Sequence, residues 1–156
     1  MAQRKEWMKQ IFQIVMVVEN LDKTLENWKR LVEFDTASIR TGETPRDAEC
    51  IYCGKPVQCP ARYAVFDLGG VEMKLVEPLN QEGPYADSLK KGGPGIHHLG
   101  FYTEDMDALT ERFQERGEVP VYEETCCGGH YALYDFTAGT GMTVAPWDHM
   151  EGPCAR

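Results

Sequence analysis

Two stretches of the sequence repeat the same pattern of an apolar strand, a turn and the start of a helix. The first covers residues 13–22 and the second covers residues 98–107, which gives an offset of 85 residues (98 minus 13). The same offset places Trp28 on Phe113, so the apolar helix positions repeat along with the strands. Because two kinds of element recur at one spacing, we predict a duplicated supersecondary unit.

The first copy predicts one strand, one helix and three further strands. Apolar and β-branched residues favour a strand at 11–18. Apolar residues then recur at helical spacing, so residues 20–33 are expected to form an amphipathic helix with Asn20 as its N-cap. The later strands are expected at 36–40, 62–68 and 71–77, with the Gly69-Gly70 hairpin turn between the last two.

The second copy predicts the same order of elements. A strand is expected at 96–102, and Met106, Leu109 and Phe113 mark one face of a helix that ends at Gly117. Three strands follow, at 119–124, 131–136 and 141–145. The expected organisation is one domain, with a first module at 11–78, a linker with a short helix at 79–94, a second module at 95–146 and a tail at 147–156.

Composition and charge narrow the classes of partner. The 156 residues are 42% hydrophobic and 26% charged, which is typical of a globular protein. The net charge of −9 repels phosphate backbones, so we expect no nucleic-acid partner. No apolar run approaches the roughly 20 residues that cross a bilayer, and no apolar signal segment opens the chain. We therefore expect a cytoplasmic protein with no membrane partner.

Three of the six cysteines lie in the stretch 41–60, which also holds three prolines and two glycines. Cys50 and Cys53 have the spacing of a zinc-binding pair, and Cys59 follows them. No second such pair and no His-x(3–5)-His completes four ligands, so we expect reduced thiols rather than zinc. We expect this stretch to be a long irregular loop, a feature that is often functional.

Three segments carry a resemblance to a known family: residues 18–23 (VENLDK), 75–79 (LVEPL) and 95–101 (GIHHLGF). With the paired modules, they resemble the vicinal oxygen chelate (glyoxalase-like) superfamily over about residues 11–146, and methylmalonyl-CoA epimerases most of all. The resemblance implies an α+β fold in which two βαβββ modules form a curled mixed sheet around a cavity. It also implies a homodimer.

The resemblance assigns the superfamily's metal-binding positions to Gln13, Lys74, His98 and Thr143. A lysine ammonium has only donors and repels a cation, and threonine is a poor neutral ligand. We therefore expect a cavity that holds no metal and needs no cofactor.

The superfamily's chemistry implies a cofactor-independent racemase or epimerase that moves a proton at a carbon adjacent to a carbonyl, through an enolate. The predicted catalytic residues are His98, Lys74 and His130. A charged Lys74 would stabilise the enolate oxygen, a neutral one would act as a base, and His98 or His130 would transfer protons. Each side chain could instead have a purely structural role.

The expected partner is a small molecule. The predicted substrate-binding residues are Gln13, Thr143, Val15, Phe66, Tyr102 and Tyr134. Apolar and aromatic lining of this kind favours an apolar or aromatic ketone, such as the isoflavanone dihydrodaidzein that racemases of isoflavone-converting bacteria act on. Two alternatives stay open: a metal-free protein that binds and sequesters small molecules, and a methylmalonyl-CoA epimerase or other metal-dependent lyase whose ligands lie at other positions.

Overall fold

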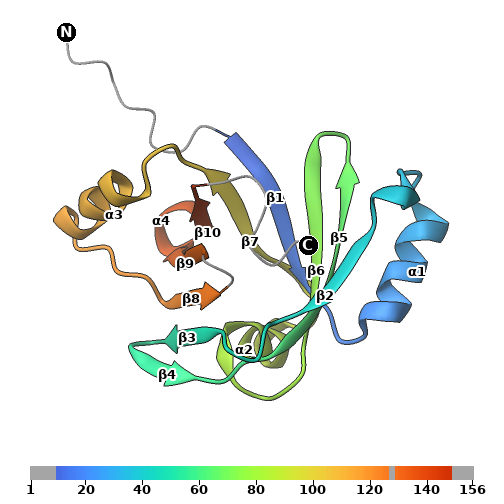
Figure 1. The fold of residues 1–156 in the computed structure, drawn as a ribbon, viewed down its shortest axis with the longest axis horizontal. Helices are drawn as coiled ribbons and strands as arrows, with labels where there is room; N and C mark the ends of the chain where they lie inside the picture. Colours follow the sequence, from blue (N-terminus) through green and yellow to red (C-terminus); the bar gives the residue numbers. More distant parts are fainter. Residues whose placement is uncertain (1–9, 127–128, 149–156) are drawn as a thin grey trace, which may run out of the picture.

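The computed structural model describes residues 10–126 and 129–148 (Figure 1). The strands are β1 (Gln10–Val17), β2 (Arg40–Glu43), β3 (Glu49–Tyr52), β4 (Lys55–Val57), β5 (Ala61–Leu68), β6 (Val71–Pro78), β7 (Gly95–Tyr102), β8 (Tyr122–Cys126), β9 (Gly129–Phe136) and β10 (Met142–Trp147). The helices are α1 (Leu21–Leu31), α2 (Gly83–Gly92), α3 (Met106–Glu115) and the short α4 (Thr137–Thr140), with a 3₁₀ turn η1 (Thr36–Ser38).

All of these strands join one mixed sheet that curls around the centre of the molecule (Figure 1). Its order is β2-β5-β6-β1-β7-β10-β9-β8-β3-β4. Strand β1 pairs with β6 in parallel, and β7 pairs with β10 in parallel, so each half repeats one arrangement. The halves meet where β1 and β7 pair in antiparallel. The predicted α+β fold with a curled mixed sheet is therefore confirmed.

The stretch predicted as an irregular loop holds two paired strands. Strands β3 and β4 form a hairpin, and β3 also pairs with β8 from the other half of the chain. This hairpin adds two strands to the far side of the second half. The prediction was wrong because strands of three and four residues are too short to show an alternating pattern.

The predicted strand at 36–40 is also corrected. Residues Thr36–Ser38 form the turn η1, where the Asp35 side chain accepts a hydrogen bond from the Ala37 backbone N–H. The strand begins only at Arg40 and runs to Glu43 beside β5. A local side-chain cap thus competes successfully with strand pairing at this point.

Helices α1 and α3 cover the outer face of the sheet. The Asn20 side chain caps α1 through the Lys23 backbone N–H, as predicted, and Leu21 and Leu25 are buried beneath the helix. On the same outer face, the rings of Phe34 and Phe66 stack with centroids 4.4 Å apart. Phe66 therefore packs towards α1 and not towards the hollow, which corrects its predicted role as a substrate contact.

Helix α3 packs on the outer face of the second half of the sheet, as α1 does on the first half. Its N-cap is Asp105, whose side chain accepts a hydrogen bond from the Ala108 backbone N–H. Its buried Phe113 lies 4.6 Å from the Tyr134 ring, centroid to centroid. Tyr134 therefore belongs to the outer core and not to the hollow, a second correction among the predicted substrate contacts. Within the described residues, the helices are all too short or too polar to span a membrane.

Candidate functional site

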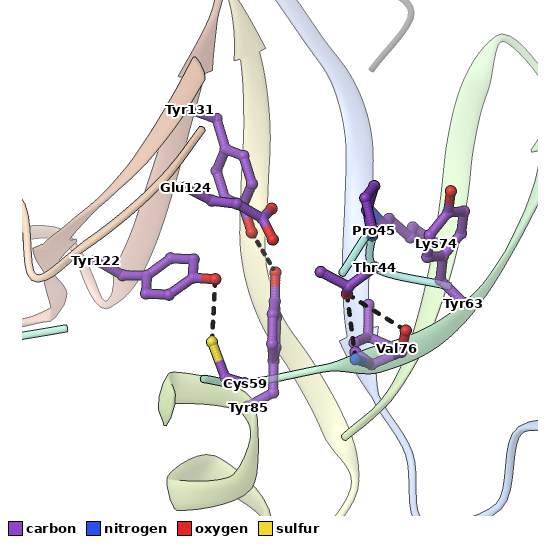
Figure 2. A pocket seen from close by; sticks show the side chains of 11 residues that line it. Thr44, Pro45, Cys59, Tyr63, Lys74, Val76, Tyr85, Tyr122, Glu124 and Tyr131 are labelled. Carbon is purple, nitrogen blue, oxygen red and sulfur yellow. Dashed lines mark hydrogen bonds between the residues drawn. The ribbon is translucent and has the colours of Figure 1, made fainter. Parts of the chain in front are cut away.

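A small, partly open cavity lies where the inner faces of the two sheet halves approach each other (Figure 2). Its volume is about 30 Å³, which is room for about one or two water molecules. Its lining residues are Thr44, Pro45, Cys59, Ala61, Tyr63, Lys74, Val76, Tyr85, Tyr122, Glu124 and Tyr131. Both halves and α2 contribute, and the lining combines a cation, a carboxyl group, a thiol and several phenols.

Lys74 supplies the cation of the cavity. It lies on β6, where Val15 of β1 and Val65 of β5 are its register partners. Its Nζ atom lies 4.7 Å from the centroid of the Tyr63 ring, so the ring face supports the charge through a cation–π contact. His98 is the register partner of Val15 on the other side of β1. The structure thus brings Lys74 and His98, two of the predicted catalytic residues, to one face.

Glu124, on β8, supplies the carboxyl group. Burial raises the pKa of Glu124, although the charge of Lys74 and hydrogen bonds from Tyr131, Cys50 and Tyr122 act in the opposite direction. A buried carboxyl group with a raised pKa can take up and return a proton closer to neutral pH than an exposed one can. Glu124 is not among the site residues predicted from the sequence, because nothing local distinguishes it from Glu123.

Two phenols extend the polar group inside the cavity. The hydroxyl oxygens of Tyr85 and Tyr131 lie 3.2 Å apart, and Tyr131 also hydrogen bonds with Glu124. Burial raises the pKa of both phenols, so both are neutral and keep a proton to donate. Figure 2 shows Tyr85 reaching from below towards Tyr131, with the Glu124 carboxyl group beside them. The arrangement is a short chain of proton donors and acceptors.

Hydrogen bonds among neighbouring groups determine the tautomer of His98. His97 Nε2 lies 3.3 Å from the backbone oxygen of Pro84, which can only accept, so His97 carries its proton there. His97 Nδ1 is then an acceptor, and it lies 2.9 Å from His98 Nδ1. His98 must therefore donate from Nδ1 and keep a lone pair on Nε2. Burial, then the charges of His97 and Lys74, lower the pKa of His98 well below its usual value.

Gln13, on β1, lies on the same inner face of the sheet, but its side-chain amide is already hydrogen bonded to a neighbouring residue. Its Nε2 donates to Glu72 Oε1 over 2.5 Å, while Arg40 binds the other Glu72 oxygen over 2.6 Å. Gln13 of β1 and Glu72 of β6 are register partners. In the second half Leu99 pairs with Val144, so the residues before them, His98 and Thr143, also lie opposite each other. By this internal symmetry Glu72, and not Lys74, holds the β6 position equivalent to Thr143.

The divalent metal that the fold family uses fits these residues poorly. Both oxygens of Glu72 are already held by an amide and a guanidinium group, and Lys74 adds a cation two residues along the same strand. Within residues 10–126 and 129–148, no three His, Cys, Asp or Glu side chains are grouped closely enough to hold an ion. We therefore derive no chemical step through a metal.

The other predicted site residues lie elsewhere. Thr143 lines a separate hollow of about 480 Å³ together with His97 and Asp135. His130 is exposed, has Nδ1 3.1 Å from Thr125 Oγ1, and lines a third hollow of about 370 Å³. Register places Gln13, Lys74, His98 and Thr143 on one face of four neighbouring strands, but of the four only Lys74 lines the small cavity, so the expectation of one shared hollow is not met.

The two remaining substrate-contact predictions concern apolar residues. Val15 is buried on the inner face in a cluster with Tyr63, Val65 and Val76, beside the cavity. Tyr102 packs at the margin of a second cluster, which is built around Trp147. Both residues pack around the site, and neither lines the small cavity itself.

Comparison with known proteins agrees with this architecture. The sequence pattern of the glyoxalase/bleomycin resistance protein/dioxygenase superfamily matches residues 12–134. A 4-hydroxyphenylpyruvate dioxygenase of Sus scrofa is 29% identical over 125 residues, which cover 68% of this chain and 31% of that protein. The uncharacterized protein YqjC of Bacillus subtilis (strain 168) is 36% identical over 53 residues, 31% of this chain and 38% of its own. The chain thus spans about a third of the length of these curated relatives.

Solved structures show the same fold at low identity. The methylmalonyl-CoA epimerase of Mycobacterium tuberculosis has a TM-score of 0.65 and 20% identity, over 94% of this chain and 91% of that one. A Streptomyces coelicolor methylmalonyl-CoA epimerase in complex with 2-nitronate-propionyl-CoA has a TM-score of 0.64 and 20% identity, over 89% and 96%. At this identity the similarity concerns the fold.

Proposed function

The chain belongs to the glyoxalase/bleomycin resistance protein/dioxygenase superfamily, and from that premise we propose that it is an isomerase acting on a carbon next to a carbonyl group. One observation carries the proposal. Lys74 and Glu124, from opposite halves of the sheet, line one small cavity together with neutral phenols. This is the equipment that enolate formation needs: a base, a fixed positive charge and a proton donor.

The proposed mechanism uses only these side chains. The Glu124 carboxylate removes the proton from the carbon next to the carbonyl. The C–H bonding pair forms a carbon–carbon double bond, and the π pair of the carbonyl group moves onto its oxygen. Lys74 stabilises the negative charge that develops there, because a fixed cation in a water-poor site costs little reorganisation. Tyr131, supported by Tyr85, then returns a proton to the carbon, and the protonated Glu124 passes its proton to the Tyr131 oxygen through their hydrogen bond, which restores both groups. Racemisation results when the proton returns to the opposite face of the planar enolate.

Neutral histidines keep the charge of the site on Lys74. Burial lowers the pKa of His97 as well as that of His98, so neither competes as a cation. His98 does not line the small cavity, so we do not assign it the direct proton transfer predicted from the sequence. Its proposed role is to stay neutral beside Lys74. His130, on the third hollow, is left out of the mechanism.

The volume of the cavity limits the size of the substrate group that can enter it. A volume of about 30 Å³ admits little more than the reacting atoms of a substrate, so the remainder must lie outside. Two classes are the first to test. Thioesters such as methylmalonyl-CoA are named in a solved neighbour of the same fold. Isoflavanones of the dihydrodaidzein type have an activated C–H next to a ketone, as the sequence argument requires.

Deuterium incorporation tests the proposal directly. The protein is incubated in heavy water with a panel of α-substituted thioesters and ketones, and label at the carbon next to the carbonyl is measured by mass spectrometry. We expect label uptake with loss of optical purity, unchanged by EDTA. The Glu124→Gln variant keeps the shape of the side chain and should exchange about 10²- to 10⁴-fold more slowly.

Three outcomes would overturn the proposal. The first is ligand binding without any label uptake, which would favour a protein that sequesters small molecules. The second is loss of exchange on chelation, which would favour metal-dependent chemistry. The third is an unchanged rate in Glu124→Gln, with Glu123→Gln as the matched neighbour that points to the other face of β8.

A further inference from the structure

Two buried thiols converge on one hydroxyl group in the wall of the candidate site. The Tyr122 hydroxyl oxygen lies 3.3 Å from Cys50 Sγ and 3.3 Å from Cys59 Sγ. The two thiols also hydrogen bond with each other. The β3–β4 hairpin brings them together, since Cys50 is the register partner of Val57, two residues before Cys59. The sulfur atoms are thus neighbours in the folded chain.

The two thiols differ in acidity, which suits them to thiol–disulfide chemistry. Hydrogen bonds from Cys50 and Tyr122 lower the pKa of Cys59. The hydrogen bond to Cys59, and then burial, raise the pKa of Cys50, which stays protonated. Cys59 is therefore the sulfur that attacks as a thiolate, and Cys50 is the resolving partner.

The attacking thiol borders a cavity that is partly open, so a small oxidant can approach it. Cys59 lines this cavity together with Lys74 and Glu124. Cys50 lines the hollow of about 370 Å³ on the other side of the β3–β8 ladder. Cys53, which lies between them in sequence, is exposed and lines neither of these two hollows.

We propose that Cys50 and Cys59 form a reversible disulfide that makes the candidate site sensitive to oxidants. With a diazene oxidant such as diamide, the Cys59 thiolate adds to one nitrogen of the N=N bond. Cys50 sulfur then attacks Cys59 sulfur and displaces the reduced hydrazine. One S–S bond forms, and the two thiol protons end on the hydrazine nitrogens, so the protein loses two electrons and two protons.

The disulfide would change the chemistry of the cavity wall. Cys50 Sγ donates to Glu124 Oε1 over 3.8 Å in the reduced protein, and an oxidised sulfur has no proton to donate. Tyr122 would also lose both thiol partners in their present form. This consequence rests on the proposed function: oxidation should lower the rate of proton exchange, and dithiothreitol should restore it.

Peptide mapping of the full chain tests the disulfide itself. The protein is oxidised with diamide, unfolded, alkylated with N-ethylmaleimide and digested. Trypsin should not cut at Lys55 because Pro56 follows it, so residues 47–62 keep all three cysteines on one peptide. We expect this peptide to carry one alkyl group, on Cys53, and to have lost about 2 Da through one S–S bond. Chymotryptic cleavage after Tyr52 should leave its two halves joined.

Serine variants provide the matched controls. Cys53→Ser should still form the bond, whereas Cys50→Ser and Cys59→Ser should not. Alkylation of both Cys50 and Cys59 after oxidation, or pairing of either with another cysteine, would overturn the proposal. The mass readout needs no substrate, so a disulfide that forms in a protein without exchange activity would contradict the proposed function alone. Unchanged exchange in the oxidised protein would contradict the link to the site.

Discussion

Glu124 shows how the pairing of one strand decides the chemistry of one side chain. It follows Glu123 in a short polar strand, and nothing in the local sequence separates the two. Register places Glu124 opposite Tyr131 and Cys50, on the inner face, and Glu123 opposite Ala132, on the other. The inner position removes water from the carboxyl group, which is why the pKa of Glu124 is raised while it lies beside Lys74.

Removing the cation should reveal its electrostatic role. In Lys74→Met the enolate loses its fixed positive charge, so exchange should fall by about 10²- to 10³-fold. The pKa of Glu124 should also rise further, because Lys74 now lowers it. The acid limb of the rate–pH profile should therefore move to higher pH. Lys74→Arg keeps the charge and should leave the limb close to its original pH, and a limb that moves the other way in Lys74→Met would contradict this account.

His98 should make the folded protein sensitive to acid. Burial lowers the pKa of His98, so the unfolded chain binds a proton more readily than the folded chain does. Stability is then present above the unfolded pKa of about 6.5 and is lost as pH falls, by at most about 1.4 kcal/mol per pH unit for one proton. Urea denaturation between pH 7.5 and about 5 measures this slope.

A glutamine variant isolates the contribution of His98. His98→Gln should be less stable near neutrality, because it replaces a buried imidazole, but it should lose less stability on acidification. His130→Gln changes an exposed histidine and is the matched comparison. An equal slope in all three proteins would show that another group controls the acid sensitivity. His97, whose pKa burial also lowers, is the next residue to test.

At the scale of elements, the β3–β4 hairpin and α2 complete the site. The hairpin carries Cys50 and precedes Cys59, while α2 supplies Tyr85. Gly83 begins α2 with φ at +91°, and a Cβ atom placed there would lie 2.6 Å from Cys59 Cβ. The helix therefore approaches the loop that carries Cys59 as closely as a glycine allows.

Substituting this glycine should loosen the contact between α2 and the hairpin. Gly83→Ala introduces both a strained backbone and a clash, and we expect a loss of about 1 to 3 kcal/mol in the free energy of unfolding. Gly92→Ala, at the other end of α2, meets open space and should be neutral or slightly stabilising. Thermal denaturation compares the two variants, and equal effects would argue against the close approach.

At the scale of the whole molecule, one continuous sheet joins the two halves. The halves share the β1–β7 ladder, and the β3–β4 hairpin of the first half pairs with β8 of the second. The inner cluster around Leu133 and Trp147 takes residues from both halves, including Phe12 and Cys50. Neither half can therefore bury its inner face alone. The homodimer stays a prediction, which sedimentation velocity would test.

A shared core predicts a single unfolding transition. Trp28 packs on the outer face of the first half, and Trp147 is buried in the second. In variants that keep only one of these two tryptophans and have Trp7 replaced as well, fluorescence should report the same urea midpoint, equal to that from far-UV circular dichroism. Leu133→Ala, which removes a fully buried side chain, should lower both midpoints through a loss of about 2 to 5 kcal/mol. Separate midpoints for the two halves would show that the modules unfold independently.

The resemblance to the superfamily implied the curled mixed sheet, whereas the residues by themselves determined the duplicated strand–helix pattern and the helix cap at Asn20. Helix periodicity, capping and apolar strands are local, so these features can be derived from neighbouring residues. The resemblance also singled out Lys74, which lines the cavity. Only the tertiary structure decided that Glu124 and Cys59 join Lys74 there, and that Thr143 and His130 do not. The physical reason is register: shifting a strand by one residue reverses the face of every side chain, and pairing between distant strands fixes that choice.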